Sequence, residues 1–349
     1  MAPRRGSGGY SSSYWSYSNP WAQETKFYME MWPSKTMFIA DFAFDVLFAL
    51  ALIAFLTWAC LIRNHGQMKG IILGLIFWLF SEITDIIYEI FFLAEAVVTQ
   101  YYNIDIMLQI FFSVFTYCII VFVFYNLIHR MLNRLTDSGK PYATVAIVHW
   151  IILGIVTTVS LASWALSVVI RVKFVQDEYF SDISRDLNKV DSARAIILWL
   201  ISLEIFAWTV FVAMKAGSHR FTSRSPVYAL LAGSICWFAF CLMYAVIYIR
   251  YYLEVTYIYP SYLNLVTSVL TFIFGIGTLV GILLCCQKWR HVDDSADKAP
   301  ATMQYPYAGA PYQPYPLQQQ WQPYPGQPQP QYPQQFQQPV QEHQQQPQK

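Results

Sequence analysis

The sequence predicts an all-α fold: a polytopic membrane protein built as a bundle of seven transmembrane helices, with a polar tail at each end. Three observations lead to this prediction. Hydrophobic residues make up 56% of the 349 residues. Charged residues make up only 12%, about half of the roughly 25% that is usual in soluble domains. The apolar residues also gather in seven long runs, which excludes a soluble enzyme of this size.

Each run is long enough to cross a bilayer as a helix, which takes about 20 apolar residues. A spanning segment must satisfy its own backbone hydrogen bonds, so helices are expected unless strands close into a barrel. Barrel strands are segments of about ten residues with alternating polarity, whereas these runs are longer and do not alternate. The predicted spans are residues 37–62, 70–94, 105–128, 142–170, 192–216, 227–251 and 262–286.

The predicted spans lie between two tails of different composition. Residues 1–36 are rich in Ser, Tyr and Gly and lack the apolar segment of a cleaved signal peptide. Residues 292–349 are rich in Pro, Gln and Tyr. Such segments bury too little apolar surface to offset the entropy lost on ordering, so we expect both tails to be disordered. The membrane domain is then residues 37–291.

Lys and Arg indicate which ends of the spans face the cytosol, because cytosolic connections carry an excess of these residues. They cluster in the first, third and fifth connections and after the seventh span. The second connection, residues 95–104, has none, and the fourth, residues 171–191, mixes both signs. We therefore expect the N-terminal tail outside the cell, the C-terminal tail in the cytosol, and the plasma membrane as the location.

Carboxyl groups inside the predicted spans are the main candidates for function. A charged side chain in the hydrocarbon costs about 3 kcal/mol on insertion scales and usually faces the bundle interior. Glu82, Asp85 and Glu89 follow the spacing i, i+3, i+7, which places them on one face of the second helix. Asp41 and Asp45 lie one turn apart near the outer end of the first span.

The third, fourth and seventh predicted spans each carry a polar face that can meet these carboxyl groups. With all faces turned inward, the outer half of the bundle encloses an acidic, hydrated cavity. Clustered carboxyl groups in a low dielectric cannot all stay ionised, so we expect them to share protons and to attract a cation. The polar faces are Gln109, Ser113 and Thr116; His149, Ser160, Ser163 and Ser167; and Asn264, Ser268, Thr271, Gly275 and Thr278.

Glu204 and His149 are further candidates for ligand or proton binding. Glu204 lies near the middle of the fifth span, and no Lys or Arg is expected deep in any span to pair with it. His149 lies about two turns from the cytosolic end of the fourth span, either as a packing residue or as a member of a proton relay. The alternative for each acid is a neutral carboxyl group that is hydrogen-bonded to Ser, Thr or Tyr, or that faces the interface.

The remaining chemistry-bearing residues predict no enzyme, no cofactor and no metal site. No CxxC or His/Cys ligand spacing occurs, and a ceramidase-like zinc hydrolase would need several His and Asp ligands. The net charge of +1 gives no sign of nucleic-acid binding. Cys285 and Cys286 end the seventh span beside Lys288 and Arg290. They are candidates for palmitoylation or, alternatively, small apolar residues at a helix end.

Two stretches of the sequence resemble a known group of membrane proteins. Ile62–Gly70, running into Leu75–Ser81, is similar to the first inner loop and second span of fungal heptahelical integral membrane proteins. Glu82, and Arg250 with Glu254, resemble more loosely the fungal lipid-translocating exporters of the RTA type. The resemblance covers the seven spans as an architecture; it implies the fold and transfers no functional residue.

Three functions follow from this layout. The first is a receptor-like or sensor protein whose acidic cavity binds a small cationic or polar ligand, or protons. The second is a proton-coupled transporter or exporter, and the third a structural organiser of the membrane that acts through its C-terminal tail. G-protein-coupled receptors share the seven spans, but the third span here lacks a DRY-type triplet and the seventh lacks NPxxY. The expected partners are the lipid bilayer, the ligand, and a cytosolic protein at the inner loops or tail.

Overall fold

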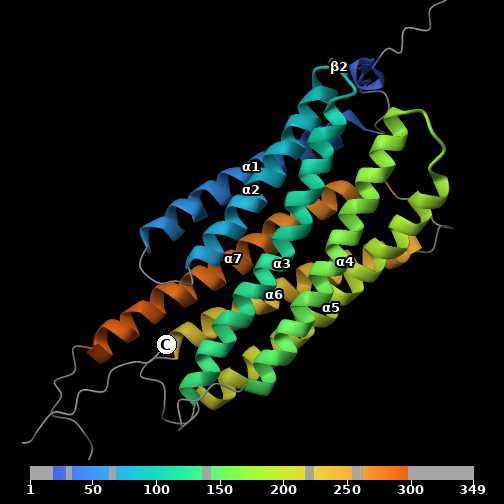
Figure 1. Ribbon diagram of the computed structural model, residues 1–349. Coiled ribbons are helices and arrows are strands. Elements are labelled where there is room, and N and C mark those ends of the chain that lie inside the picture. Colours follow the sequence, from blue (N-terminus) through green and yellow to red (C-terminus); the bar gives the residue numbers. More distant parts are fainter. Residues whose placement is uncertain are drawn as a thin grey trace, which may run out of the picture. The chain divides into compact units, whose positions relative to one another are not determined.

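The computed structural model describes residues 19–28, 34–62, 68–135, 143–216, 224–253, 260 and 262–297, with only the backbone of 135 and 290–297. The prediction of seven spanning helices is confirmed, because seven described helices are long and apolar enough to cross a membrane (Figure 1). The chain is therefore a multi-pass membrane protein. Its helices are α1 (Lys35–Leu61), α2 (Met68–Leu93), α3 (Tyr102–Leu135), α4 (Ala143–Val175), α5 (Ser181–Ala216), α6 (Ser225–Ile247) and α7 (Tyr262–Asp297). Shorter elements are the 3₁₀ turn η1 (Pro20–Ala22), the strands β1 (Glu24–Lys26) and β2 (Val97–Thr99), and the π-helical turn η3 (Tyr248–Leu253).

Several helices are longer than the predicted spans, because polar residues continue them beyond their apolar part. α5 begins at Ser181, inside the mixed-charge segment that we predicted as a connection. There Lys189 Nζ lies 3.0 Å from Asp186 Oδ1, one turn away, and such pairs support exposed helices. α7 likewise continues to Asp297, into the segment predicted to be a tail, and the rest of that tail lies outside the described residues.

Part of the predicted N-terminal tail also has regular structure. β1 pairs antiparallel with β2, which lies in the connection between α2 and α3. Phe27 follows β1 and packs with Phe38 of α1 and Phe92 of α2 in a small buried cluster. A three-residue strand anchored by one aromatic side chain leaves no periodic pattern in the sequence, which is why hydropathy did not indicate it.

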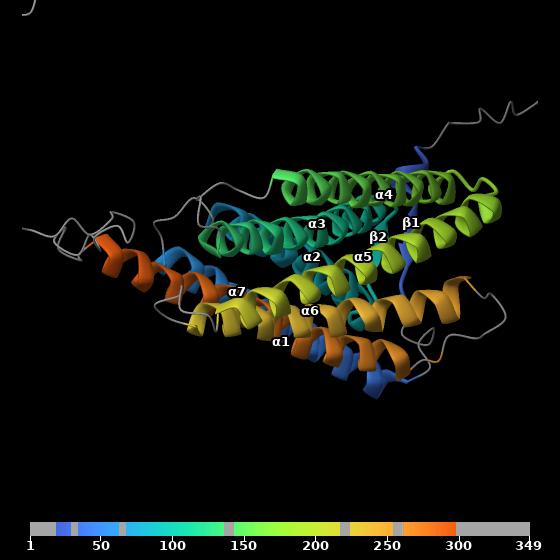
Figure 2. The ribbon, with the colours of Figure 1, turned by 90° about the horizontal axis from the view of Figure 1, so that it is seen from below.

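Consecutive helices lie side by side, and α7 packs against both α6 and α1 (Figure 2). α3 contacts α2, α4 and α5. Because the chain alternates in direction, α1, α3, α5 and α7 all begin at the end of the bundle that carries β1 and β2. We call this the β end, and the other the opposite end.

α6 and α7 approach each other closely where Gly233 meets Gly281. A Cβ atom at Gly281 would lie 2.6 Å from the backbone nitrogen of Gly233, and one at Gly277 would lie 2.5 Å from Cys236 Sγ. Only glycine fits such a backbone contact. The GxxxG pattern of residues 277–281 therefore packs helices within this chain.

Candidate cation site and a buried histidine cluster

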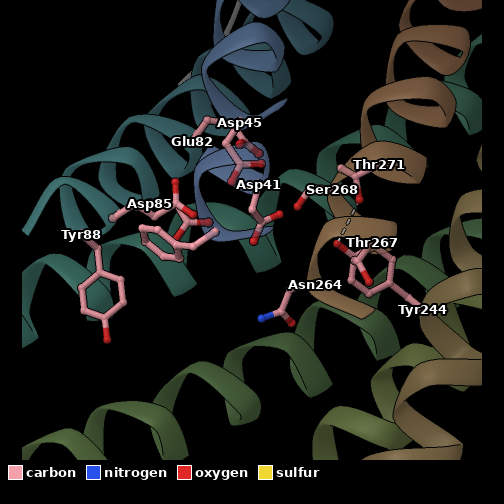
Figure 3. Close-up of a pocket in the computed structure, with 12 residues that line it drawn as sticks. Asp41, Asp45, Glu82, Asp85, Tyr88, Tyr244, Asn264, Thr267, Ser268 and Thr271 are labelled. Atoms are coloured by element: carbon pink, nitrogen blue, oxygen red, sulfur yellow. Dashed lines mark hydrogen bonds between the residues drawn. The ribbon is translucent and has the colours of Figure 1, made fainter. Parts of the chain in front are cut away.

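Acidic side chains from α1 and α2 line one cavity of about 280 Å³ near the β end. The acids of each helix share a face because of their spacing, and α1 packs beside α2, so the two acidic faces meet (Figure 3). The structure thus brings together the acids predicted for the first two spans. Glu204 and His149 lie elsewhere. The acids that line the cavity are Asp41, Asp45, Glu82, Asp85 and Glu89.

The opposite wall of the cavity is polar and uncharged. α7 provides most of it, and Figure 3 shows Ser268 beside Asp41. The hydroxyl of Tyr244 on α6 hydrogen-bonds the hydroxyl of Thr271, 3.3 Å away. Two further aromatic side chains, Phe38 and Tyr88, complete the lining. The lining residues of α7 are Asn264, Thr267, Ser268 and Thr271.

The acids of the cavity have no cationic neighbour in its lining. Among the described residues, no Lys, Arg or His lines it. Asp41 and Glu89 are only 7% and 8% exposed, and one carboxyl oxygen of each has no hydrogen-bond partner in the described part of the chain. A buried polar atom without a partner costs about 1–3 kcal/mol. The cavity therefore favours any occupant that brings hydrogen-bond donors or positive charge.

A buried layer of aromatic side chains lies next to the acids, toward the middle of the bundle. Phe48 follows Asp45 by three residues and Trp78 precedes Glu82 by four, so each lies one turn from its acid. The ring centroids of Phe48 and Trp78 are 5.1 Å apart, and those of Trp78 and Phe240 are 6.2 Å apart. We call Phe48, Trp78 and Phe240 the aromatic layer; each is at most 4% exposed.

Asp85 and Tyr88 also line a second cavity, of about 220 Å³, between α2, α3 and α4. Its lining includes Arg171 and Gln109. We expected Arg171 in the fourth connection, but α4 continues to Val175 and places this residue on the helix. Asp85 therefore differs from the other acids, because the second cavity that it lines is also lined by the cationic side chain of Arg171.

Glu204 and His149 meet where α3, α4 and α5 pack together. His149 Nε2 lies 2.9 Å from Glu204 Oε1. The Glu204 carboxylate also accepts the Tyr125 hydroxyl at 2.6 Å and the Trp208 indole N–H at 3.2 Å. The Tyr125 ring stacks on the His149 ring, with centroids 4.0 Å apart and planes at 8°. His149 Nδ1 lies 2.9 Å from Nε2 of His129. We call these five residues the histidine cluster.

The predicted spans contain one histidine, His149, but the structure places a second histidine, His129, beside it. We ended the third span at residue 128, but α3 continues to Leu135 and includes His129. His129 lies one turn after Tyr125 on the same face, a spacing that could have indicated a polar partner for His149. Glu204 likewise has its own cationic partner when His149 is protonated, rather than belonging to the acidic cavity.

A buried arginine lies near the predicted start of the fifth span, where we expected no partner for an acid. Arg194 is 7% exposed, and its Nη2 lies 3.5 Å from Asp191 Oδ1. The same oxygen accepts the Ser163 hydroxyl at 2.5 Å. Because α5 begins at Ser181, Arg194 lies almost four turns into the helix, at about 3.6 residues per turn. Arg194 is the third residue of the predicted span 192–216, so nothing in the sequence indicated its burial.

The two cysteines considered for palmitoylation, Cys285 and Cys286, lie in the packed part of α7. Cys285 is 0% and Cys286 8% exposed, and both belong to the main hydrophobic core. α7 continues well past them to Asp297, so they lie inside the bundle and not at a helix end. The structure favours the alternative, in which both are small apolar packing residues.

The arrangement of acids does not form a metal site. In the part of the chain that the structure describes, no three His, Cys, Asp or Glu side chains are placed to hold a metal ion.

No protein-family model matches the sequence, no curated protein matches it, and no solved structure matches the fold. The resemblance to fungal heptahelical membrane proteins therefore stays a prediction, and function has to be argued from the two clusters themselves.

Proposed function

We propose that this chain is a receptor-like seven-helix protein whose acidic cavity binds a small organic cation. The observation that carries the proposal is the unbalanced charge of the cavity. Several acids line it without a cation in the described lining, and Asp41 and Glu89 each bury a carboxyl oxygen that has no partner there. A ligand that combines positive charge with N–H donors satisfies both requirements at once.

The lining favours an ammonium-type cation over a bare metal ion. The described acids do not converge as metal ligands do. Phe38, Tyr88 and Tyr244 add aromatic rings to the lining, and cations are attracted to the faces of such rings. At about 280 Å³, the cavity lies just below the range of roughly 300–1,000 Å³ for sites of drug-sized ligands. The proposed ligand is therefore a small amine or quaternary ammonium compound.

The aromatic layer supports a receptor over the alternative of a transporter. Phe48, Trp78 and Phe240 are buried and in ring contact, so they close the space next to the acids. In a receptor, occupation of the cavity shifts the balance between helix packings, and this layer passes the shift from α1 and α2 to α6. The organiser alternative depends on the C-terminal tail, which lies almost entirely outside the described residues.

The proposal includes the orientation and location expected from the distribution of Lys and Arg. With the N-terminus outside, the β end and its acidic cavity face the extracellular side, where a receptor of the plasma membrane meets its ligand. Glycosylation acceptor sites introduced next to β2 and, separately, between α3 and α4 test this. Modification only at the first site supports the orientation, and modification only at the second contradicts it.

Cation binding is tested on the purified full-length protein in lipid nanodiscs. Tetramethylammonium and butylammonium are added separately, with sodium as the reference, and thermal unfolding is followed. A ligand that binds only the folded state stabilises it, by about 2.7 kcal/mol at 100 times its Kd. We expect this stabilisation in the natural protein and its loss in the Asp41→Asn and Glu89→Gln variants.

A matched control separates the cavity from general surface charge. Glu178 is 54% exposed and pairs with Lys173 at 3.0 Å, away from the cavity lining, so Glu178→Gln should respond to the cations like the natural protein. Equal unfolding temperatures with and without both ammonium compounds would refute the proposal. Solute flux in liposomes above that of empty vesicles, abolished by Glu82→Gln, would favour the transporter instead.

A further inference from the structure

The histidine cluster lies far from the acidic cavity and close to the other face of the membrane domain. His149 is the seventh residue of α4, which starts at the opposite end, so it lies about 9 Å along the helix from that end at 1.5 Å per residue. Asp41 is the seventh residue of α1 and lies equally close to the β end. The two clusters therefore belong to opposite sides of the bundle.

A cavity of about 130 Å³ lies against the cluster, between α3 and α4. Its lining includes Tyr125, Asn126, His129 and His149. A cavity of this size has room for several water molecules, and four polar side chains provide partners for them. His149 itself is only 2% exposed, so the partly exposed ring of His129 is the route from the cavity to the buried pair.

The hydrogen bonds of the cluster limit where protons can be. Glu204 accepts from Tyr125 and Trp208 and faces His149 Nε2, as an ionised carboxylate does. His149 Nε2 lies 2.9 Å from Glu204 Oε1 but is not aligned for a hydrogen bond with a described residue; we place a proton on this nitrogen because an ionised carboxylate can only accept one. Its Nδ1 lies 2.9 Å from His129 Nε2, and one proton between these two nitrogens completes the bond. The pair is neutral with that single shared proton, and His129 Nδ1 remains free to accept one more.

We infer that the histidine cluster is a second binding site of this protein, which takes up one proton from water at the opposite end of the bundle. The incoming proton forms a bond with His129 Nδ1. The proton on His129 Nε2 moves to His149 Nδ1, so that His149 holds a proton on each nitrogen. The result is an imidazolium at 2.9 Å from the Glu204 carboxylate, and no other bond changes.

Two groups around the pair, Glu204 and the Tyr125 ring, favour the protonated form, whereas burial of the rings opposes it. Among the described residues, α3 directs Tyr125 and His129 toward it, α4 provides His149, and α5 directs Glu204 and Trp208 toward it. Glu204 supplies the negative charge. The Tyr125 ring lies flat against His149, and an aromatic face attracts a cation. No competing cationic side chain is in this set, apart from the two histidines themselves.

Proton uptake would change how three helices are held together. The neutral pair links α3 to α4 by one hydrogen bond, whereas the protonated pair adds an ion pair between α4 and α5. A change of pH on this side therefore alters the packing of α3, α4 and α5 without a ligand in the acidic cavity. The inference does not depend on cation binding, and each can fail while the other stands.

The test is an NMR titration of the full-length protein in nanodiscs with ¹⁵N-labelled histidine. The sequence contains six histidines, so few signals are present, and His129→Gln and His149→Gln assign the two of interest. We expect these two to titrate together and to take up one proton per protein. Independent titration of the two, or no uptake by either, overturns the inference.

Three variants distinguish a proton site from mere packing. Glu204→Gln removes the counter-charge, and we expect at least tenfold weaker proton binding by the pair. Tyr125→Phe keeps the carboxylate but removes one of its donors, so proton binding should strengthen; it serves if Glu204→Gln does not fold. Glu89→Gln, in the acidic cavity, should leave the histidine signals unchanged. Equal titrations in all variants, or a shift caused only by Glu89→Gln, contradict the inference.

Discussion

The acidic cavity and the histidine cluster both place carboxyl groups inside a membrane domain, and they satisfy them in different ways. Glu204 has two hydrogen-bond donors and a histidine nitrogen around its carboxylate. Asp41 and Glu89 are more deeply buried, yet each has an oxygen without a partner in the described chain. A satisfied network holds helices together by itself, whereas an unsatisfied one gains stability from an occupant. Buried carboxyl groups therefore contribute to packing in the histidine cluster, and in the acidic cavity they leave the unmet hydrogen-bonding capacity on which the proposed cation binding rests.

The largest loss of unfolding free energy is expected when the hydrogen-bonded carboxylate of the histidine cluster is removed. Glu204→Leu leaves the Tyr125 hydroxyl, the Trp208 indole and His149 Nε2 without their common acceptor. Removing one partner of a buried charged network costs about 3–5 kcal/mol, and we expect a loss of unfolding free energy in this range. Equilibrium unfolding in mixed detergent micelles measures it. An unchanged free energy would mean that the three donors find other partners, and that the cluster does not hold α3, α4 and α5 together.

A packing change without charge provides the reference for that loss. Gly281→Ala places a Cβ atom 2.6 Å from the backbone nitrogen of Gly233, and overpacking of this kind costs about 1–3 kcal/mol. We expect a loss near 2 kcal/mol that is the same at low and neutral pH, because no titratable group takes part. Gly154→Ala is the matched control, since nothing lies within 4 Å of its Cβ position. Because Ala favours a helix over Gly, Gly154→Ala should not lose stability; a loss of equal size in both variants would show that the contact of α6 with α7 is not the cause.

The acidic cavity was largely predictable from the sequence, whereas the histidine cluster was not. The spacing of Glu82, Asp85 and Glu89 is enough to predict a polar helix face, because the backbone fixes the periodicity of a helix. The polar face of the seventh span was predicted to meet these acids and lines their cavity, whereas none of the polar residues predicted for the third and fourth spans does. The pairing of His129 with His149 could not be predicted in the same way. It depends on where α3 ends in water, and hydropathy reports only the part of a helix that lies in lipid.

Arg194 and the N-terminal strand escaped prediction for related reasons. Arg194 is buried although it lies close to the predicted start of the fifth span, because α5 begins earlier, at Ser181, and packs over a longer stretch. β1 is held by a pairing with β2, some 70 residues away in the chain, and nothing in either segment alone indicates the other. Contacts between distant segments decide both cases, and a single sequence shows only local patterns.

A substitution in the acidic cavity should raise the unfolding free energy, whereas Glu204→Leu in the histidine cluster should lower it. Glu89→Gln removes one charge from a crowded group of acids and supplies an N–H donor to its neighbours. We expect the empty protein to gain about 1 kcal/mol of stability, the size of one net hydrogen bond. The stabilisation by butylammonium should disappear in the same variant. Unfolding with and without the amine measures both effects, and a loss of stability comparable to that of Glu204→Leu would show that Glu89 is already satisfied.

The smallest change in unfolding free energy is expected for the exposed acid Glu178, which serves as the reference for the buried acids. Glu178 forms an ion pair with Lys173 at 3.0 Å, but the two side chains are 54% and 31% exposed. Exposed pairs of this kind contribute about 0–1 kcal/mol, because water screens the charges and both side chains lose freedom. We therefore expect Glu178→Gln to change the unfolding free energy by less than about 0.5 kcal/mol. A larger change would mean that charge at the β end acts over a distance, and the gain in Glu89→Gln could then no longer be assigned to the cavity. A null result ties that gain, and the response to amines, to burial rather than to the number of acids.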